Sequence, residues 1–206
     1  MNGAWCYYYA MNFTIKEKLK LALAAREKVN VIANGEIVAA VLVPLFYKEG
    51  ECHVLLTRRT NTVKTSKGQI SFPGGACEPE DKTLLDTALR GTAEEVGIPS
   101  GEVEVLGELD DASTATFGYL ISPFVGVIPY PYPLKPEPAE IEEILEVPIS
   151  TLLDPQNFRE AVWERSGRKT PVEQFDYKGH IIWGLTCRIL KNFLPIWVKV
   201  NSREGL

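Results

Sequence analysis

Two adjacent glutamates, Glu94 and Glu95, lie near the end of a segment whose pattern predicts a helix over residues 84–96. At about 100° per residue, positions 91, 94 and 95 share an arc of roughly 100° on that helix. Carboxylates on one exposed helical stripe can bind hard cations such as Mg²⁺ or Mn²⁺. Arg90 precedes Glu94 by four residues and can hold its carboxylate through a charge-assisted hydrogen bond.

Gly74 and Gly75 come before this helix, where the absence of a Cβ would let backbone carbonyls approach a bound cation. Gly97 follows the helix and is predicted to end it. A metal held between the glycines and the helix could polarise a pyrophosphate and activate water for attack on phosphorus. A solvated helix face is the simpler interpretation of an isolated Glu-Glu pair, but the glycines and Arg90 at matching offsets favour a metal site.

Hydrophobic periodicity predicts the elements that must position these residues. Helices are expected at 14–27, 84–96, 149–153 and 185–193, and strands at 37–47, 52–57, 103–108, 119–128, 172–177 and 180–183. Residues 129–138 contain five prolines and cannot form a helix or a central strand, which makes them the nearest thing to a linker. Leu85, Leu89 and Val96 gather on one face of the helix, which is expected to pack into the core. Strands interrupted by helices imply an α/β fold, an α/β/α sandwich around a mixed β-sheet.

The composition fits a metabolic enzyme of the cytoplasm that forms one domain over residues 1–206. A formal net charge of −5 argues against binding to nucleic acid or to an anionic membrane. The four cysteines are scattered without a CxxC pair and are interpreted as reduced thiols. No segment approaches the ~20 apolar residues that a membrane span needs.

Residues 1–13 are expected to be a peripheral extension. The first ten residues lack the basic start and the long apolar run of a secretory signal. Met11 could be the true start of the protein, and an added edge strand or a contact in a homodimer are the alternatives for this segment.

The stretch 74–98 resembles the signature box of the Nudix hydrolase superfamily, whose members hydrolyse a nucleoside diphosphate linked to another group. The matching positions are Gly75, Asp81 at the acidic position, Arg90, Glu94, Glu95, Gly97 and Ile98. The resemblance implies a Nudix fold and a Mg²⁺ or Mn²⁺ cofactor held by Gly75, Glu94 and Glu95. It also implies catalytic roles for Arg90, Glu94 and Glu95.

Gly91 stands where that family has a glutamate which ligates metal and often helps to activate water. Glycine inside a helix costs about 1 kcal/mol relative to alanine, so the helix itself is expected to gain nothing from it. A carboxylate from elsewhere could compensate, with Glu143 the main candidate beside Glu140 and Glu142. Alternatively, hydrolysis is weakened and only binding remains, or Gly91 is an engineered or accidental substitution. A weakened site is favoured, and restoring glutamate is expected to raise the rate by at least roughly tenfold.

Further segments resemble the coenzyme A diphosphatase branch of the superfamily. They are the run Leu55-Leu56-Thr57-Arg58-Arg59-Thr60, residues 68–75, the eight-residue spacing from Asp81 to Arg90, Thr87–Arg90, and Ile182-Trp183-Gly184-Leu185-Thr186. Ser66 departs from the branch, where histidine is common. The resemblance runs from about residue 37 to 195. It implies a CoA-like nucleotide as the small-molecule partner, cleaved to 3′,5′-ADP and 4′-phosphopantetheine.

Arg58, Arg59 and Gly74 are the residues expected to contact the substrate, the arginines through guanidinium–phosphate contacts. Because adjacent strand residues point to opposite faces, at most one of the two arginines is expected to face the pocket. Phe72 and Trp183 could stack on adenine, but buried core aromatics are the commoner outcome.

Three functions are therefore compared. The first, which the signature favours, is a metal-dependent diphosphatase acting on coenzyme A or its thioesters. The second is a catalytically silent Nudix module that binds a nucleotide as a sensor or regulator. The third is a Nudix hydrolase acting on ADP-ribose, a dinucleotide or a nucleoside triphosphate.

Overall fold

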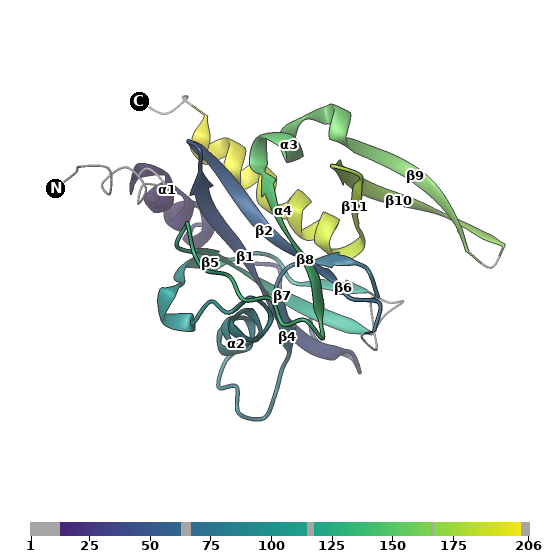
Figure 1. The fold of residues 1–206 in the computed structure, drawn as a ribbon, viewed down its shortest axis with the longest axis horizontal. Coiled ribbons are helices and arrows are strands. Elements are labelled where there is room, and N and C mark those ends of the chain that lie inside the picture. The colour runs from purple at the N-terminus through teal and green to yellow at the C-terminus, as the bar shows by residue number, and fades with distance from the viewer. Residues whose placement is uncertain (1–12, 63–66, 115–117, 166, 203–206) are drawn as a thin grey trace.

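The computed structural model describes residues 13–62, 67–114, 118–165 and 167–202 (Figure 1). Its helices are α1 (Phe13–Ala24), α2 (Leu84–Val96), α3 (Ile149–Leu153) and α4 (Gly184–Asn201), with short 3-10 turns η1 (Ser100–Glu102) and η2 (Pro155–Asn157). Its strands are β1 (Ile37–Lys48), β2 (Glu51–Arg59), β3 (Ile70–Ser71), β4 (Gly74–Ala76), β5 (Glu104–Glu108), β6 (Ala112–Thr114), β7 (Tyr119–Val127), β8 (Ile141–Pro148), β9 (Phe158–Arg165), β10 (Arg168–Tyr177) and β11 (His180–Trp183). The first ten residues and Ser66, for which the sequence raised expectations, lie outside the described residues.

The larger sheet is built around β1 and is mixed. β1 runs parallel to β7, from the pair Ile37–Tyr119 to the pair Leu45–Val127. The other pairings in this sheet are antiparallel: β2 and β4 pair with β1, β5 and β6 pair with β7, and β3 and β8 pair with β2. The predicted mixed sheet is confirmed.

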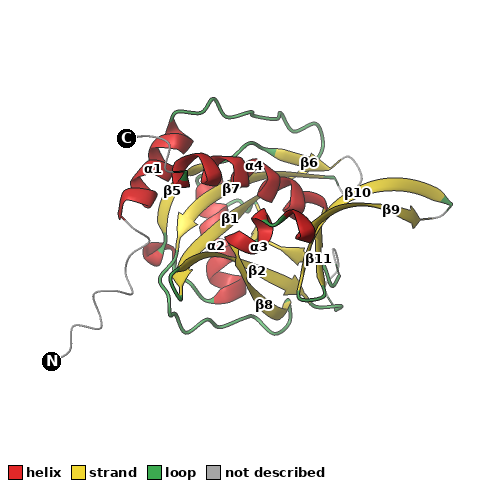
Figure 2. Cartoon of the chain, turned by 90° about the horizontal axis from the view of Figure 1, so that it is seen from above, coloured by secondary structure: helices red, strands yellow, loops and turns green. Residues whose placement is uncertain are grey.

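Side chains of β1 alternate between two hydrophobic cores because successive strand residues point to opposite faces. The larger core combines side chains of α1 and α4 with the odd-numbered β1 residues Val41, Val43 and Leu45. The smaller core combines side chains of α2 with the even-numbered β1 residues Ala40, Leu42 and Phe46. Figure 2 shows α1 and α4 on one side of the sheet and α2 on the other. The predicted α/β/α sandwich is therefore confirmed.

Helix α2 has the predicted bounds, and both of its ends are capped. The Thr83 hydroxyl accepts a hydrogen bond from the Asp86 backbone N–H, while the Asp86 carboxylate accepts one from the Thr83 N–H. This reciprocal pair is a capping box, which satisfies two backbone donors at the start of the helix. Gly97 ends the helix as predicted, in the left-handed conformation with a φ of 77°.

The buried face of α2 matches the predicted one only in part. Its members are mostly small, and they are Thr87, Ala88, Gly91, Thr92, Glu95 and Val96. Val96 is buried as expected and Leu85 packs against the smaller core, but Leu89 is only half-buried. Small side chains let the helix approach β1 and β4 closely, so steric fit rather than hydrophobicity alone decides which face is buried. The expectation that Glu94 and Glu95 share one exposed stripe is wrong, because Glu95 is buried.

The proline-rich segment 129–138 is not a linker. Lys135 and Glu137 donate their backbone N–H groups to the carbonyl oxygens of Val96 and Glu95 at the end of α2, both at 3.0 Å. The Tyr130 ring stacks on Phe46 of β1 with ring centroids 4.7 Å apart. The segment therefore covers the end of α2 and leads the chain directly into β8.

Strand β8 could not be predicted from local propensity, because three of its eight residues are glutamates, which are depleted in strands. It forms because β2 offers a partner from His53 to Arg59. β9, β10 and β11 form a second, three-stranded sheet, whose β9–β10 hairpin projects from the rest of the chain in Figures 1 and 2. The sequence predicted its last two strands but not β9. Helix α4 continues past the predicted end at residue 193 to Asn201.

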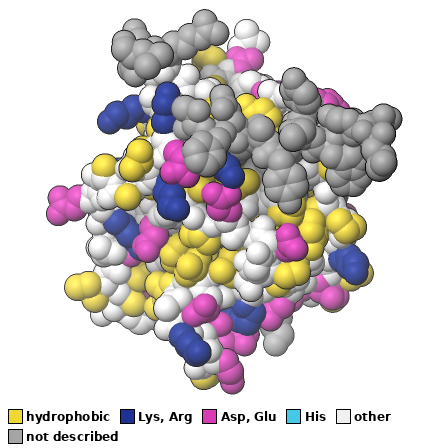
Figure 3. Space-filling model, turned by 90° about the vertical axis from the view of Figure 1, so that its left-hand side faces the viewer, with side chains coloured by type: hydrophobic (Ala, Val, Ile, Leu, Met, Phe, Trp, Pro, Cys, Tyr) yellow, Lys and Arg dark blue, Asp and Glu magenta, His cyan; other side chains and the backbone are white. Residues whose placement is uncertain are grey.

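The surface carries charges of both signs. On the face shown in Figure 3, Lys and Arg side chains are interspersed with Asp, Glu and hydrophobic side chains. In the described part of the chain, no helix is both long and apolar enough to cross a bilayer.

Candidate active site

Gly74 and Gly75 lie beside β1 because β1 exchanges one antiparallel partner for another along its length. Pairing of β1 with β2 stops at Leu45 and Val54, and β4 takes the place of β2 along the first half of β1. In this register Gly74 lies opposite Val41, and Gly75 lies opposite Ala40. The exchange brings the two glycines against helix α2, which packs on β1 and β4.

Gly91 is the residue of α2 that touches this glycine pair. A Cβ added at position 91 would lie 2.4 Å from the carbonyl carbon of Gly74 and 2.7 Å from its Cα. Such distances are far below van der Waals contact, so any side chain would force the helix away from β4. The expectation that the helix gains nothing from Gly91 is therefore wrong. Restoring glutamate at this position also requires the loop and the helix to separate.

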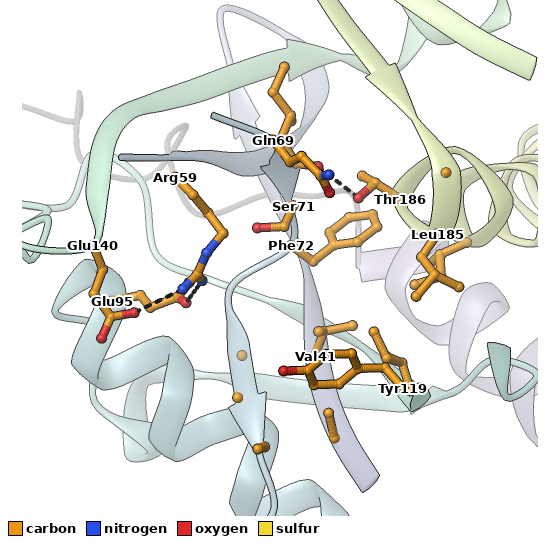
Figure 4. A pocket seen from close by; sticks show the side chains of 18 of the residues that line it. Val41, Arg59, Gln69, Ser71, Phe72, Glu95, Tyr119, Glu140, Leu185 and Thr186 are labelled. Atoms are coloured by element: carbon orange, nitrogen blue, oxygen red, sulfur yellow. Dashed lines mark hydrogen bonds and ion pairs between the residues drawn. The ribbon is translucent and has the colours of Figure 1, made fainter. Parts of the chain in front are cut away.

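A cavity of about 690 Å³ opens beside the C-terminal half of α2, and it has two unlike sides (Figure 4). The ionic side consists of Glu78, Glu94, Glu95, Glu137 and Glu140 with Arg59 and Arg90. The apolar side includes Val41, Phe72, Tyr119, Ile121, Trp183 and Leu185. Gly74 and Gly75 line the same cavity. Such a cavity suits a ligand that carries phosphate groups beside a less polar arm.

Glu95 is the buried carboxylate of this site, with a relative exposure of 5%. Its Oε1 accepts a hydrogen bond from Arg59 Nη1 at 3.0 Å, whereas its buried Oε2 has no partner among the described residues. Burial raises the pKa of Glu95 to about 7, although the positive charge of Arg59 acts in the opposite direction. The carboxylate is thus held in a place where a cation would stabilise its charged form.

Glu95 is expected to make the stability of the metal-free protein fall as pH rises. Its pKa in the folded chain, about 7, lies above the ordinary 4.5, so the folded state binds this proton more tightly than the unfolded state. The free energy of unfolding should therefore decrease between about pH 4.5 and 7, by on the order of 3 kcal/mol, and level off above that range. Urea denaturation of the native chain and of Glu95→Gln across this range measures the difference, which isolates Glu95 from other groups. Equal pH profiles for the two proteins would contradict the expectation.

Arg90 fixes the loop that leads into α2. Its Nε and Nη2 donate to the two oxygens of Asp81 at 3.0 and 2.8 Å, and Nη2 also donates to the Ala76 carbonyl at 2.9 Å. The Arg90 guanidinium holds the pKa of Asp81 well below its usual range. A weaker contact of 3.1 Å reaches Glu94, which is 61% exposed. Arg90 was expected to bind Glu94, but its main partner is Asp81.

Of the two arginines expected to bind substrate, the structure places Arg59 on the cavity and Arg58 away from it. Arg58 Nε donates to Glu143 at 3.1 Å, and its Nη2 lies 3.1 Å from Glu142. The two side chains separate because neighbouring strand residues point to opposite faces. Glu143, the carboxylate first considered as compensation for Gly91, thus pairs with Arg58 and does not line the cavity.

Glu140 does line the cavity, and sequence reasoning ranked it below Glu143. Its Oε2 lies 3.3 Å from Arg59 Nη2, and its backbone carbonyl accepts a hydrogen bond from the Thr60 N–H at 2.7 Å. Glu78, Glu137 and Tyr119, which also line the cavity, were missed; Glu137 and Tyr119 reach it only through the tertiary fold. Phe72 and Trp183, for which a core position was the commoner expectation, both line the apolar side, and Phe72 is also buried in the larger core.

The donor atoms around Glu95 fit a divalent cation. Mg²⁺ and Mn²⁺ prefer carboxylate and carbonyl oxygens, and the buried Oε2 of Glu95 lacks any partner within the described ranges. Glu94, one residue earlier, is exposed on the same side of the cavity. In the part of the chain that the structure describes, no three acidic, histidine or cysteine side chains already converge as a metal site. Instead, the Arg59 guanidinium lies between Glu95 and Glu140.

Comparison with known proteins gives consistent matches. A family profile described as NUDIX domain matches residues 36–165. The Nudix hydrolase NudL of Photorhabdus laumondii is 41% identical over 152 residues, which are 74% of this chain and 80% of the relative. NudL of Yersinia pestis is 36% identical over 154 residues, or 75% of this chain and 76% of the relative.

Two solved structures show the same fold. The NUDIX hydrolase from Alicyclobacillus acidocaldarius has a TM-score of 0.53 at 18% identity and covers 84% of this chain and 98% of its own. The MutT/nudix family protein from Enterococcus faecalis has a TM-score of 0.52 at 14% identity, covering 93% and 80%. At such identities the similarity concerns the fold alone.

Proposed function

The chain belongs to the NUDIX domain family, and from this membership we propose that it is a metal-dependent diphosphatase of coenzyme A or its thioesters. The products would be 3′,5′-ADP and 4′-phosphopantetheine. The observation that carries the proposal is the environment of Glu95, a buried carboxylate whose Oε2 is unpaired among the described residues, at a cavity with one ionic and one apolar side.

The residues of the site take distinct roles in this proposal. Glu94 and Glu95, with the backbone of Gly75, would hold Mg²⁺ or Mn²⁺. When bound, such a cation polarises a phosphoryl group and makes a bound water more acidic. Arg90 keeps the glycine loop in place through Asp81 and the Ala76 carbonyl.

Glu140 is the carboxylate we propose to accept the proton of the attacking water. It lines the cavity, whereas the alternative, Glu143, is engaged by Arg58. Its distance of 3.3 Å to the Arg59 guanidinium places it beside the groups expected to contact the diphosphate. A general base must lie within hydrogen-bond reach of the water it activates, and in the proposed complex Glu140 would do so from this edge of the cavity. Glu140 would thus replace the family glutamate that position 91 cannot accommodate.

Coenzyme A as substrate is supported by the four segments that resemble the coenzyme A diphosphatase branch. A member of each segment lines the cavity: Arg59 from 55–60, Gly74 from 68–75, Arg90 from 87–90 and Trp183 from 182–186. The apolar side offers room for the pantetheine arm or an acyl chain next to the ionic side, which would bind the diphosphate. We also propose a cytoplasmic location, because Cys52, Cys77 and Cys187 are free thiols, as suits a reducing compartment.

A nucleotide-binding sensor is the second candidate, and Gly91 is the observation that favours it. With no carboxylate at this position, the chain keeps the cavity and its arginines but lacks one acidic group of the family box. Such a protein would bind its nucleotide tightly without turning it over.

A substrate comparison tests these alternatives. We expect kcat/KM for coenzyme A and acetyl-coenzyme A, with Mg²⁺ or Mn²⁺, to exceed that for ADP-ribose, diadenosine tetraphosphate and ATP by at least about tenfold. Product analysis by mass spectrometry should find 3′,5′-ADP. More efficient cleavage of ADP-ribose or the dinucleotide would contradict the proposal that coenzyme A is the substrate. Tight binding of a nucleotide without turnover of any compound would favour the sensor.

A further inference from the structure

Arg59 joins two carboxylates of the site from the end of β2. Its Nη1 lies 3.0 Å from Glu95 Oε1, and its Nη2 lies 3.3 Å from Glu140 Oε2 (Figure 4). A register shift between Arg58 and Arg59 in the β2–β8 pairing accompanies this orientation. The guanidinium therefore occupies the space between the two carboxylates, both of which attract positive charge.

The contact between Arg59 and Glu95 is incomplete. Arg59 Nε and Glu95 Oε2 are both buried, and neither has a hydrogen-bond partner within the described part of the chain. Arg90, in the same cavity, differs in this respect, because its Nε and Nη2 donate to both oxygens of Asp81. A buried donor and a buried acceptor without partners are costly, so the Arg59–Glu95 contact is the weaker of the two pairs.

The two unpaired atoms would be satisfied by partners of opposite charge. Glu95 Oε2 is an acceptor that a cation would satisfy, and Arg59 Nε is a donor that an anionic oxygen would satisfy. A divalent cation together with a phosphate group supplies both partners at once.

We propose that the Arg59 side chain adopts two positions. It competes with the metal for Glu95, and it moves to the substrate when the metal binds. This inference rests on the proposed metal-dependent function. In the first position Arg59 neutralises Glu95 and Glu140, as the structure shows. In the second position the metal holds Glu95, and the released guanidinium binds the diphosphate with its Nε and a terminal nitrogen. Metal and diphosphate would then strengthen each other's binding, because each stabilises the second position.

Substitution of Arg59 separates this mechanism from a simple phosphate contact. The variant is Arg59→Gln, and Arg58→Gln is the matched control because Arg58 lies on the same strand and pairs with Glu142 and Glu143 instead. Mn²⁺ binding without nucleotide is measured by electron paramagnetic resonance. We expect Arg59→Gln to bind Mn²⁺ about tenfold more tightly than the native protein, and Arg58→Gln to bind within about twofold of it.

A second readout uses methylenediphosphonate, a diphosphate that cannot be hydrolysed. Mn²⁺ should raise its affinity for the native protein about tenfold, and Arg59→Gln should lose most of that gain. Arg59→Lys, with one point of contact fewer, should fall between the two proteins in Mn²⁺ affinity. Circular dichroism and urea denaturation establish that each variant is folded.

The outcomes distinguish the inference from the function on which it rests. If the native protein binds Mn²⁺ and both Arg59 variants bind it equally or less tightly, the competition is disproved while the metal-dependent function stands. If neither the native protein nor Arg59→Gln binds Mn²⁺, both are overturned. If Arg59→Gln binds Mn²⁺ and the native protein does not, Arg59 excludes the metal completely, which supports the competition.

Discussion

Glu95→Gln is expected to lower the rate of metal-dependent hydrolysis by at least about 10²-fold. The amide keeps the size of the side chain and can still accept a hydrogen bond from Arg59, but it removes the charge that would bind the cation. The side chain is buried, with 5% exposure, and its Oε2 has no other partner among the described residues, so the substitution removes the acceptor proposed for the metal. kcat/KM for coenzyme A at saturating Mg²⁺ or Mn²⁺ is the quantity to measure.

Glu80→Gln is the control for this substitution, since Glu80 is exposed on the loop before α2. It removes the same charge without touching the cavity and should leave kcat/KM within about twofold. The Glu95→Gln protein should remain folded, because the amide also avoids the cost of a buried charge. Activity of Glu95→Gln within about threefold of the native value would rule out Glu95 as the main metal ligand.

Gly91→Ala is expected to destabilise the protein by about 1–3 kcal/mol, although alanine is the better helix former. The added Cβ would lie 2.4 Å from the Gly74 carbonyl carbon, which belongs to backbone held in β4. The loss from overpacking should therefore exceed the gain of about 1 kcal/mol in helix propensity. Urea denaturation gives the difference in the free energy of unfolding.

Gly101→Ala is the matched control, because a Cβ at this glycine of η1 meets no described heavy atom within 4 Å beyond its neighbours. It should be neutral or slightly stabilising. The same overpacking leads us to expect that Gly91→Glu lowers activity instead of raising it, the reverse of the expectation from the family pattern. A Gly91→Ala protein as stable as the native one would show that α2 and β4 separate easily, and it would restore the earlier expectation.

Local signals in the sequence predicted α2, which carries Arg90, Glu94 and Glu95, but not β4, which holds Gly74 and Gly75. Gly97 was predicted to end α2; the Thr83–Asp86 capping box at its start was not predicted, although it also forms within a few residues. The apolar runs of β1, β2 and β7 likewise predicted the centre of the sheet. Caps and periodic patterns depend on neighbours in the chain, which is why they could be recognised without the fold.

The electrostatics of the site could not be predicted in the same way. Glu95 is buried because the proline-rich segment 129–138 and the end of β2 close over α2, and both lie more than 30 residues away in sequence. Arg58 and Arg59 point to opposite faces of β2, whereas Glu143 lies within β8 opposite Arg58 and Glu140 lies in the turn before β8, at the cavity. Gly91 was misjudged for a related reason: its value lies in contact with Gly74, not in the helix that contains it.

Release of 3′,5′-ADP from coenzyme A, measured in parallel for the native protein and Glu95→Gln, tests the central claim most directly. The native protein should release it with Mg²⁺ or Mn²⁺ and stop when EDTA removes the metal. The folded Glu95→Gln protein should release at least about 10²-fold less under the same conditions. Release that persists in EDTA, or that is equal in the two proteins, would contradict a metal-dependent reaction at Glu95, and no release by the native protein would contradict coenzyme A hydrolysis itself.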